Sequence, residues 1–414
     1  MRRTRCMNCD ASQLTEFIDL GEQPNGNNFV SASEKAEEVR FPIAMLVCES
    51  CWQVQIGEFP SQEFLFTNHP YVTGANVPIV EHFERLSARV IDKLALAPQS
   101  LVIDIGANDG TLLRAFARRG MRTLGVDPGQ RTGELARQQG STVMRTFWNL
   151  ESGRALRQLG LYPELITATA VFYHLPDLHD FIEGLLEVMR GDAVFVVQCV
   201  STLDLIEKNQ FDHFYHEHSC IHAIAPLDRL FRAHGMRILD VEFIEIHGGS
   251  FVAYVGLDSH TRPTSPSVAA AIAREHERGL DRIGTYHEFA RRVRANADAL
   301  VALLRQIKSQ GKRVFALGAP VKGNTLLNYC GIGPDLVECA TEVNQFKIGT
   351  LTPGMHIPVV DERAIASQPD YYLILSWNFL DFLIGKYKGF LMNGGKFIVP
   401  VPTVRVLGFE ATSR

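Results

Sequence analysis

The stretch Ser100-Leu-Val-Ile-Asp-Ile-Gly-Ala-Asn-Asp-Gly110 decides the fold of this chain. It is a short apolar run that ends in a glycine turn. A helical run, Thr111–Ala117, follows the turn, and a second apolar run over residues 121–127 ends in an acid. Strand, glycine turn, helix, strand and terminal acid form the βαβ unit that binds nucleotides at the carboxyl edge of a parallel sheet. The sequence therefore predicts an α/β fold with a Rossmann-like sheet.

The composition of the turn indicates which nucleoside it binds. The dinucleotide fingerprint Gly-x-Gly-x-x-Gly is absent, because Asn108 occupies the second glycine position. The carboxylates of Asp104 and Asp109 would repel a pyrophosphate but would tolerate a cationic sulfonium. The spacing Asp104-x-Gly106-x-x-x-Gly110 resembles motif I of class I S-adenosylmethionine (SAM) methyltransferases, which we favour over a dehydrogenase. The cofactor-binding residues expected on this basis are Asp104, Gly106, Asn108, Gly110 and Asp127, the last placed to accept hydrogen bonds from a ribose diol.

The strands that follow extend this domain to about residue 260. Residues 164–172 and 193–200 are apolar runs typical of buried parallel strands. Residues 237–246 and 250–256 are predicted to form an antiparallel hairpin joined through His247-Gly-Gly. Methyltransferase sheets end in such a reversed strand, whereas dinucleotide-binding sheets end in parallel strands. The hairpin therefore favours the same class.

A second α/β unit is predicted after a helical connection. Residues 266–310 have apolar positions at helical spacing and indicate two long helices broken near Gly284. A glycine turn between Gly318 and Gly323 then opens a helix. Asn324 stands where a P-loop requires its lysine, so ATP hydrolysis is not expected, although Lys322 and Asn324 could reach a phosphate or a sugar hydroxyl. The strands expected in this unit are 312–318, 336–341, 371–376 and 395–400.

Four of the eight cysteines form two Cys-x-x-Cys pairs, Cys6 with Cys9 and Cys48 with Cys51. In a reducing compartment these pairs predict four thiolates that hold one structural Zn²⁺. Disulfides conflict with the lack of a secretory signal, and a redox dithiol conflicts with the presence of two matched pairs. Residues 19–29, between the pairs, are rich in loop-forming residues, so metal binding is expected to supply part of the folding free energy.

The stretch 212–222, Asp-His-Phe-Tyr-His-Glu-His-Ser-Cys-Ile-His, holds four of the 14 histidines of the chain. Histidine titrates near neutrality, so a cluster of Tyr, Glu and His suits proton abstraction at physiological pH. We favour catalysis over the alternatives, a metal site and a solvated polar loop. The stretch follows strand 193–200 and should lie at the carboxyl edge of the sheet, where ligands bind. His174, which follows strand 164–172, should lie at the same edge, and a structural role suits it as well as a catalytic one.

Composition limits the partners that the chain can have. With 414 residues and 46% hydrophobic content, two or three domains are expected. The formal charge of −5 and the lack of an unbalanced basic block argue against nucleic-acid and anionic-membrane partners. No segment reaches the roughly 18 consecutive apolar residues of a membrane span. We expect a soluble, cytoplasmic protein that binds a small molecule and acts as a monomer.

Taken in order, these motifs resemble those of the bacterial sugar C-methyltransferases that act on nucleotide-linked 4-keto deoxyhexoses, and the resemblance spans essentially the whole chain. It implies SAM-dependent methylation at C3 of a dTDP-4-keto-6-deoxysugar, in branched deoxysugar biosynthesis, with C5 as the alternative position. It divides the chain into a zinc-binding domain (1–75), a methyltransferase domain (76–260), and a helical connection with a C-terminal sugar-nucleotide-binding domain (261–414). The motifs that carry it are the zinc pairs, the βαβ unit, Tyr215-His-Glu-His218, His247-Gly-Gly-Ser250, Gly318-Ala-Pro-x-Lys-Gly-Asn-Thr-Leu-Leu-Asn-Tyr329, Thr352-Pro-Gly-x-His-Ile-Pro358 and Trp377-Asn-Phe379.

The resemblance also implies roles for individual residues. His218 is the base that removes the proton beside the ketone, and Glu217 orients this base or a sugar hydroxyl. Tyr215 and His174 hydrogen-bond the developing oxyanion. The family tends to have asparagine where this chain has Ala170. The substrate-binding residues implied are Tyr71, His247, Lys322, Asn324, Trp377 and Asn378.

Three other classes remain as alternatives. A NAD-dependent sugar-nucleotide oxidoreductase or epimerase would need a dinucleotide at Gly106. A zinc-containing scaffold protein would have an inactive βαβ unit, and the presence of Asp104 with an open glycine turn argues against it. An O- or N-methyltransferase has less need of a base directed at carbon.

Overall fold

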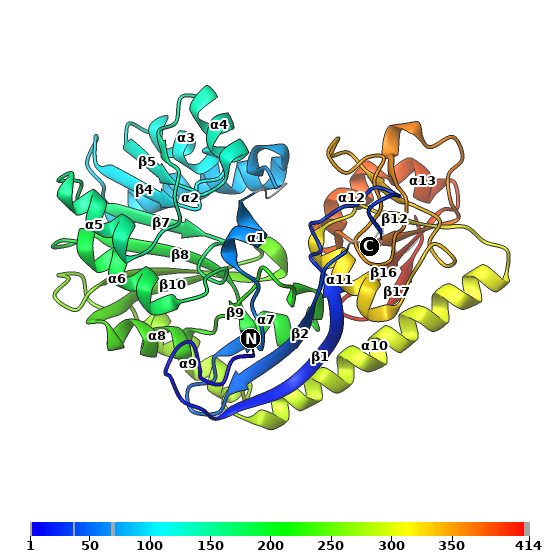
Figure 1. Cartoon of the computed structure of the whole chain (residues 1–414), viewed down its shortest axis with the longest axis horizontal. Coiled ribbons are helices and arrows are strands. Elements are labelled where there is room, and N and C mark those ends of the chain that lie inside the picture. The colour runs from blue at the N-terminus through cyan, green and yellow to red at the C-terminus, as the bar shows by residue number, and fades with distance from the viewer. Residues whose placement is uncertain (1, 36–37, 68–70, 410–414) are drawn as a thin grey trace.

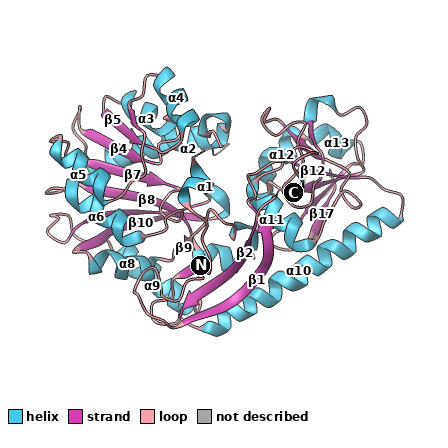
Figure 2. Ribbon diagram, viewed as in Figure 1, coloured by secondary structure: helices cyan, strands magenta, loops and turns pink. Residues whose placement is uncertain are grey.

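The structure, a computed structural model, describes residues 2–35, 38–67 and 71–409. Within these ranges the chain forms three sheets (Figures 1 and 2). The central and C-terminal domains lie on either side of the long strands β1 (Leu14–Pro24) and β2 (Arg40–Cys48), as Figure 1 shows. None of the helices within the described ranges combines the length and the apolar composition that crossing a bilayer requires.

The central sheet has seven strands in the order β6-β5-β4-β7-β8-β11-β10. Strands β6 to β8 pair in parallel, whereas β11 runs antiparallel to both β8 and β10. This arrangement confirms the predicted βαβ unit and the reversed strand of the closing hairpin. The strands are β4 (Leu101–Ile105), β5 (Arg122–Val126), β6 (Val143–Met144), β7 (Leu165–Thr169), β8 (Val194–Val200), β10 (Met236–Ile244) and β11 (Ser250–Leu257).

Helices cover both faces of the central sheet, because its strands bury apolar side chains on both sides. Val102 on β4 packs with Leu86 and Phe116 of the helices on one face, whereas its neighbour Ile103 packs with Phe181 and Leu230 on the other. The first face carries α2 (Val77–Leu94) and α3 (Thr111–Ala117), and the second carries α5 (Leu150–Gln158), α6 (Leu178–Val188), α8 (Ile224–Ala233) and α9 (Pro266–Glu277). The domain also contains α4 (Gln130–Gln138) and α7 (Thr202–Glu207).

The N-terminal sheet is antiparallel, and one of its strands comes from the central domain. Its order is β1-β2-β3-β9, with β3 (Val54–Ile56) paired to β9 (Cys220–Ile221). A short helix, α1 (Gln62–Phe66), follows β3. Because β9 is part of the histidine-rich stretch 212–222, this stretch is joined to the N-terminal sheet.

The C-terminal domain is a second, mostly parallel sheet with the order β14-β13-β12-β15-β16-β17. After β12 the chain passes through a helix to β13 on one side, and it later returns to β15 on the other side. The boundary between β12 and β15 is therefore a topological switch point, where open α/β sheets bind ligands. The elements are β12 (Val314–Leu317), α11 (Val321–Cys330), β13 (Ala340–Glu342), β14 (Val359–Asp361), β15 (Tyr371–Ile374), α12 (Leu380–Lys386), α13 (Lys388–Met392), β16 (Lys396–Val399) and β17 (Arg405–Leu407).

The long helix α10 (Ile283–Ser309) connects the domains and packs beside β1, as Figure 1 shows. Its apolar face shares one core with the N-terminal sheet and the C-terminal domain, in which Phe17 and Met45 pack with Phe289 and Leu317. The N-terminal sheet therefore shares the core of the C-terminal domain and does not depend on a core of its own.

Two details differ from the sequence-based expectations. The break between α9 and α10 falls after Glu277 rather than near Gly284, since Gly279 adopts a positive φ of 74° that ends the helical path. The segment 19–29, expected to be loop, is strand as far as Pro24. Its pairing with β2 lies too far along the chain for local composition to indicate it.

Candidate active site and zinc centre

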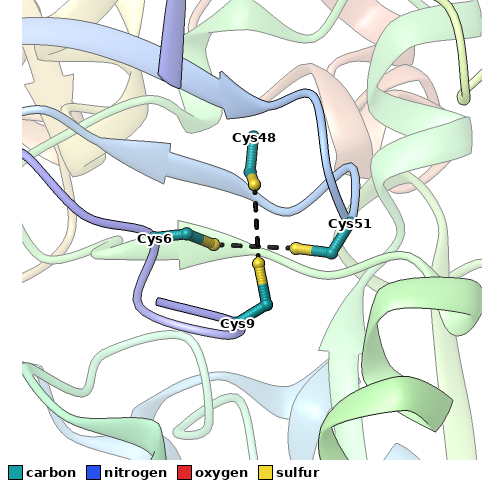
Figure 3. A group of neighbouring side chains, drawn as sticks. All are labelled: Cys6, Cys9, Cys48 and Cys51. Carbon is teal, nitrogen blue, oxygen red and sulfur yellow. Dashed lines mark hydrogen bonds between the residues drawn. The ribbon is translucent and has the colours of Figure 1, made fainter. Parts of the chain in front are cut away.

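The four cysteines of the two pairs converge on one point, as Figure 3 shows. The Sγ atoms of Cys6 and Cys51 lie 3.6 Å apart, and those of Cys9 and Cys48 lie 3.7 Å apart. A tetrahedral zinc ion with Zn–S bonds of about 2.3 Å requires S–S separations of about 3.8 Å. The backbone N–H of Asn8 also donates to Cys6 Sγ, which stabilises a thiolate. The donor set therefore fits a structural zinc ion.

One cavity of about 410 Å³ is lined by all three parts of the chain. The central domain contributes the glycine turn and the histidine-rich stretch. The N-terminal region contributes Asn27, and the C-terminal domain contributes residues at the ends of β12 and β15. This volume lies within the range of small-molecule binding sites.

The cofactor residues expected from the sequence divide into two groups. Gly106, Asn108 and Asp127 line the cavity, whereas Asp104 and Gly110 lie behind it. A Cβ on Gly106 would lie 2.3 Å from Val171 Cγ2, and the φ of this glycine is +72°. Asp127 accepts hydrogen bonds from the backbone N–H groups of Asn108 and Gly129, both at 2.8 Å, so this acid shapes the turn that opens to the cavity.

Asp104 and Asn108 stabilise this region from within. Burial raises the pKa of Asp104 to about 7, and its carboxyl accepts a hydrogen bond of 2.6 Å from Thr167 Oγ1. The side chain of Asn108 accepts from the backbone N–H of Thr73 and donates to the carbonyl oxygen of Tyr71. The glycine turn therefore fixes the segment that carries Tyr71 to the cavity wall.

His218 lies at the centre of the cavity wall. Its Nδ1 donates a hydrogen bond of 2.7 Å to the carbonyl oxygen of His213. This bond fixes the tautomer, so Nε2 carries the lone pair. The ring of Tyr215 lies with its centroid 3.9 Å from that of His218, and the ring of His174 lies 5.2 Å away. His174, Tyr215, Glu217 and His218, the four residues expected to be catalytic, all line the cavity.

The pKa of His218 differs from the near-neutral value expected from the sequence. Burial lowers it to about 3, with smaller contributions from the backbone bond to His213, which opposes the shift, and from His247 and Lys322. The imidazole is therefore neutral, and able to accept a proton, at every physiological pH. Burial also raises the pKa of Tyr215 well above its usual value, so its hydroxyl remains a donor.

The C-terminal side of the cavity presents a buried cation. Lys322 Nζ makes no hydrogen bond within the described residues and lies 4.1 Å above the centroid of the Trp377 ring. Trp377 does not line the cavity, and its indole N–H donates to Asp212 at 2.6 Å. Asn324 also lies outside the cavity, where its amide donates to the carbonyl oxygen of Gly26. The other substrate-binding residues expected from the sequence, Tyr71, His247, Lys322 and Asn378, line the cavity.

Several cavity residues were missed by the sequence analysis. Lys347 lies in a loop and carries no recognisable signal. Asn27 donates to Glu217 at 2.6 Å across 190 positions of sequence. Gln198 did carry a signal, because it is the polar residue in an otherwise apolar buried strand, and His82 on α2 is hydrogen-bonded to it.

The reversed strand β11, the glycine turn and the four-cysteine cluster define a zinc-containing class I methyltransferase. Three family models match successive parts of the chain: "Putative zinc binding domain" over residues 6–66, "Methyltransferase domain" over 79–241 and "C-methyltransferase C-terminal domain" over 245–402. The chain is 32% identical to C-methyltransferase NovU of Streptomyces niveus over 412 residues, which cover 98% of this chain and 97% of that protein. The chain belongs to this C-methyltransferase family, binds zinc and uses SAM as methyl donor.

Solved structures with partial overlap include two methyltransferases. Magnesium protoporphyrin IX methyltransferase (ChlM) from Synechocystis PCC 6803 with bound SAM is 17% identical, with 43% of this chain and 80% of that chain covered, at a TM-score of 0.33. The plantazolicin methyltransferase BpumL in complex with SAH is 11% identical, with 42% and 81% covered, at a TM-score of 0.34.

Proposed function

We propose that the chain methylates C3 of a dTDP-linked 4-keto-6-deoxysugar through an enolate. The observation that carries this proposal is that one cavity joins the glycine turn, the neutral imidazole of His218 and the switch-point crevice of the second α/β domain. A donor, a base and a subsite for a large second ligand therefore face the same space. An enzyme that methylates a small acceptor would not need the subsite formed by the C-terminal domain.

The crevice of the C-terminal domain supports an anionic second ligand. α11 begins beside the cavity, and its N-cap Pro320 provides no side-chain cap for the first-turn N–H groups. Lys322 in that turn is 9% exposed, and its ammonium group is without a hydrogen-bond partner in the described chain. A helix N-terminus with a buried lysine attracts phosphate oxygens. We assign the diphosphate of a nucleotide sugar to this subsite, with Tyr71, His247 and Asn378 on the walls around it.

The residues of the cavity account for the chemistry at carbon. His218 Nε2 accepts the proton of the carbon beside the ketone, and the C–H electrons move into an enolate. Tyr215 and His174 donate hydrogen bonds to the oxygen on which negative charge develops. The low pKa of His218 makes it a weak base in the free protein, so the enolate itself must stabilise the imidazolium as the two charges form together. SAM would be held by Gly106, Asn108 and Asp127 and would supply an electrophilic methyl group to the enolate carbon, with the sulfonium leaving as a neutral thioether when the S–C bond breaks.

Hydrogen exchange in deuterated water tests this proposal. With dTDP-4-keto-6-deoxyglucose and no SAM, we expect deuterium to be incorporated at C3, as measured by NMR. We expect His218→Ala to abolish this incorporation. Tyr215→Phe is the matched variant, since it keeps the ring beside His218 and removes one donor, so exchange should be slowed but not lost. Absence of exchange with every 4-keto sugar nucleotide tried would refute the enolate mechanism.

The same experiment separates the alternatives. Deuterium at C5 instead of C3 would assign the other methylation position. A NAD-dependent reaction would require NAD binding, so calorimetry that shows SAM binding without NAD binding excludes the oxidoreductase and epimerase hypothesis. Our preference for C3 rests on the resemblance of the motifs.

A further inference from the structure

Gln198 is a buried polar side chain that the mechanism above does not use. It lies in β8, where all seven residues of Val-Phe-Val-Val-Gln-Cys-Val are buried. Its own exposure is 2%, yet it lines the cavity. A primary amide in such a position costs free energy unless both of its ends form hydrogen bonds. Its Oε1 has a partner in the protein, His82, and the side chain borders the ligand space.

His82 fixes the orientation of this amide. Its Nε2 lies 2.6 Å from Gln198 Oε1. Because Oε1 can only accept, the imidazole must donate, so the N–H of this neutral ring is on Nε2. The amide is thereby held with its NH₂ group turned away from His82. Toward the cavity, Gln198 can offer hydrogen-bond donors only.

The order of the strands places this donor on the acceptor side of the cavity. The expected cofactor residues follow β4 and β5, whereas β8 lies two positions from β4 in the sheet, beyond β7. Gln198 is in register with Thr169 on β7 and Val252 on β11. A methyl acceptor must lie beyond the donor along the line of transfer. Gln198 is therefore placed to contact the sugar rather than SAM.

We propose that Gln198, oriented by His82, donates a hydrogen bond to the sugar carbonyl oxygen, an inference that rests on the proposed function. A group that can only donate is complementary to an oxygen that can only accept, whereas a hydroxyl suits a partner that does both. When His218 takes the proton from the neighbouring carbon, the C–H electrons form the carbon–carbon double bond and the carbonyl π electrons move to this oxygen. Gln198 keeps its own protons. Its hydrogen bond strengthens as the charge forms, so it acts on the rate more than on affinity.

Gln198→Glu provides a sharp test. The variant retains the shape of the side chain and an oxygen acceptor for His82, but it presents an oxygen instead of N–H groups to the cavity. We expect a loss of about 100-fold or more in C3 deuterium exchange and in kcat, with SAM affinity unchanged by calorimetry. If Gln198 served only to pack with His82, the variant would keep its activity, and the proposal would be overturned.

Variants of His82 test the positioning role separately. His82→Gln can still donate to Gln198 Oε1, so it should keep kcat within about threefold, whereas His82→Phe frees the amide to turn and should lose about tenfold, the effect of one neutral hydrogen bond. Both should bind SAM normally. Equal activities of these two variants would overturn the proposal even if Gln198→Glu failed to fold.

Ser87→Ala is the control for disturbance of α2. Ser87 is buried on the same helix, outside the cavity, and bonds to the carbonyl oxygen of Glu84. The Ser87→Ala variant should catalyse C3 deuterium exchange at the wild-type rate. Failure of the wild type to exchange refutes the proposed function and this inference with it, while exchange in the wild type and in Gln198→Glu alike refutes the inference alone.

Discussion

His218 is neutral because of its surroundings, and this neutrality links its proposed role as a base to the stability of the fold. The imidazole is 2% exposed, and its one donated hydrogen bond goes to a backbone carbonyl. Its pKa is lowered to about 3 in the folded chain, from 6.5. The unfolded chain therefore binds more protons than the folded chain between these two values. Stability contributed by this residue is complete above pH 6.5 and is lost as the pH falls toward 3.

The pH dependence of unfolding tests this description of His218. In His218→Gln we expect the slope of unfolding free energy against pH, between about pH 5 and 6, to be shallower than in the wild type by roughly 1 kcal/mol per pH unit. Urea unfolding at a series of pH values measures it. Tyr215→Phe is the control and should keep the wild-type slope, because Tyr215 does not titrate in this range. Parallel slopes in wild type and His218→Gln would show that His218 is protonated in the folded protein.

Ala170 adopts a backbone conformation that suits another residue. Its φ is +58°, in the left-handed region, where residues other than glycine and asparagine are strained. We expect Ala170→Asn to raise the free energy of unfolding by about 0.5–1 kcal/mol, measured by urea titration. The same substitution at Ala168, in the buried strand just before it, should lower stability, and a stabilised Ala168→Asn would contradict the backbone explanation.

At the scale of elements, the turn after β4 requires glycine at position 106. An alanine there would place its Cβ against Val171 and would be strained at a φ of +72°. We expect Gly106→Ala to weaken SAM binding by about 10- to 100-fold, corresponding to the 1–3 kcal/mol of an overpacked site. Calorimetry measures it. Gly133→Ala on α4, where nothing lies within 4 Å of the added Cβ, is the control and should bind SAM like the wild type.

Elements whose pattern is local could be predicted from the sequence. The βαβ unit and the closing hairpin were predicted because glycine turns and apolar runs specify them within a few residues. The three-residue strands β14 and β17 were not, since such short segments depend on partners far along the chain. The pairing of β3 with β9 joins residues more than 160 positions apart and leaves no local trace.

The candidate site follows the same division. His218 and its neighbours were identified because four histidines cluster in one stretch. Lys347 and His82 reach the cavity from segments whose local sequence shows nothing unusual, and only the three-dimensional arrangement brings them there. Trp377 was expected to contact substrate, but it lies behind the cavity wall, hydrogen-bonded to Asp212. The sequence indicated which segments lie near the cavity, whereas packing determines which of their side chains line it.

At the scale of the whole molecule, we expect the zinc ion to support the histidine-rich stretch 212–222, which carries the proposed base. Cys48 ends β2 and Cys51 lies in the turn that leads to β3, and β3 pairs with β9, which begins two residues after His218. Removal of zinc by a strong chelator should therefore abolish C3 exchange and lower the melting temperature, and added zinc should restore both. Deuterium-exchange assays and thermal melts, each with metal analysis of the same sample, test this prediction. Wild-type exchange in protein shown to contain no zinc would mean that β9 holds its position without the metal.

The pairing of β3 with β9 has a consequence for recombination among relatives. A chimera with a single crossover at residue 75 would pair the β3 of one relative with the β9 of another. The segment that carries His218, the proposed base, would then pack against an N-terminal sheet from a different protein. Chimeras that exchange residues 202–222 together with the N-terminal segment keep β3 and β9 from the same protein. The unit that must be exchanged as a whole is therefore discontinuous in the chain.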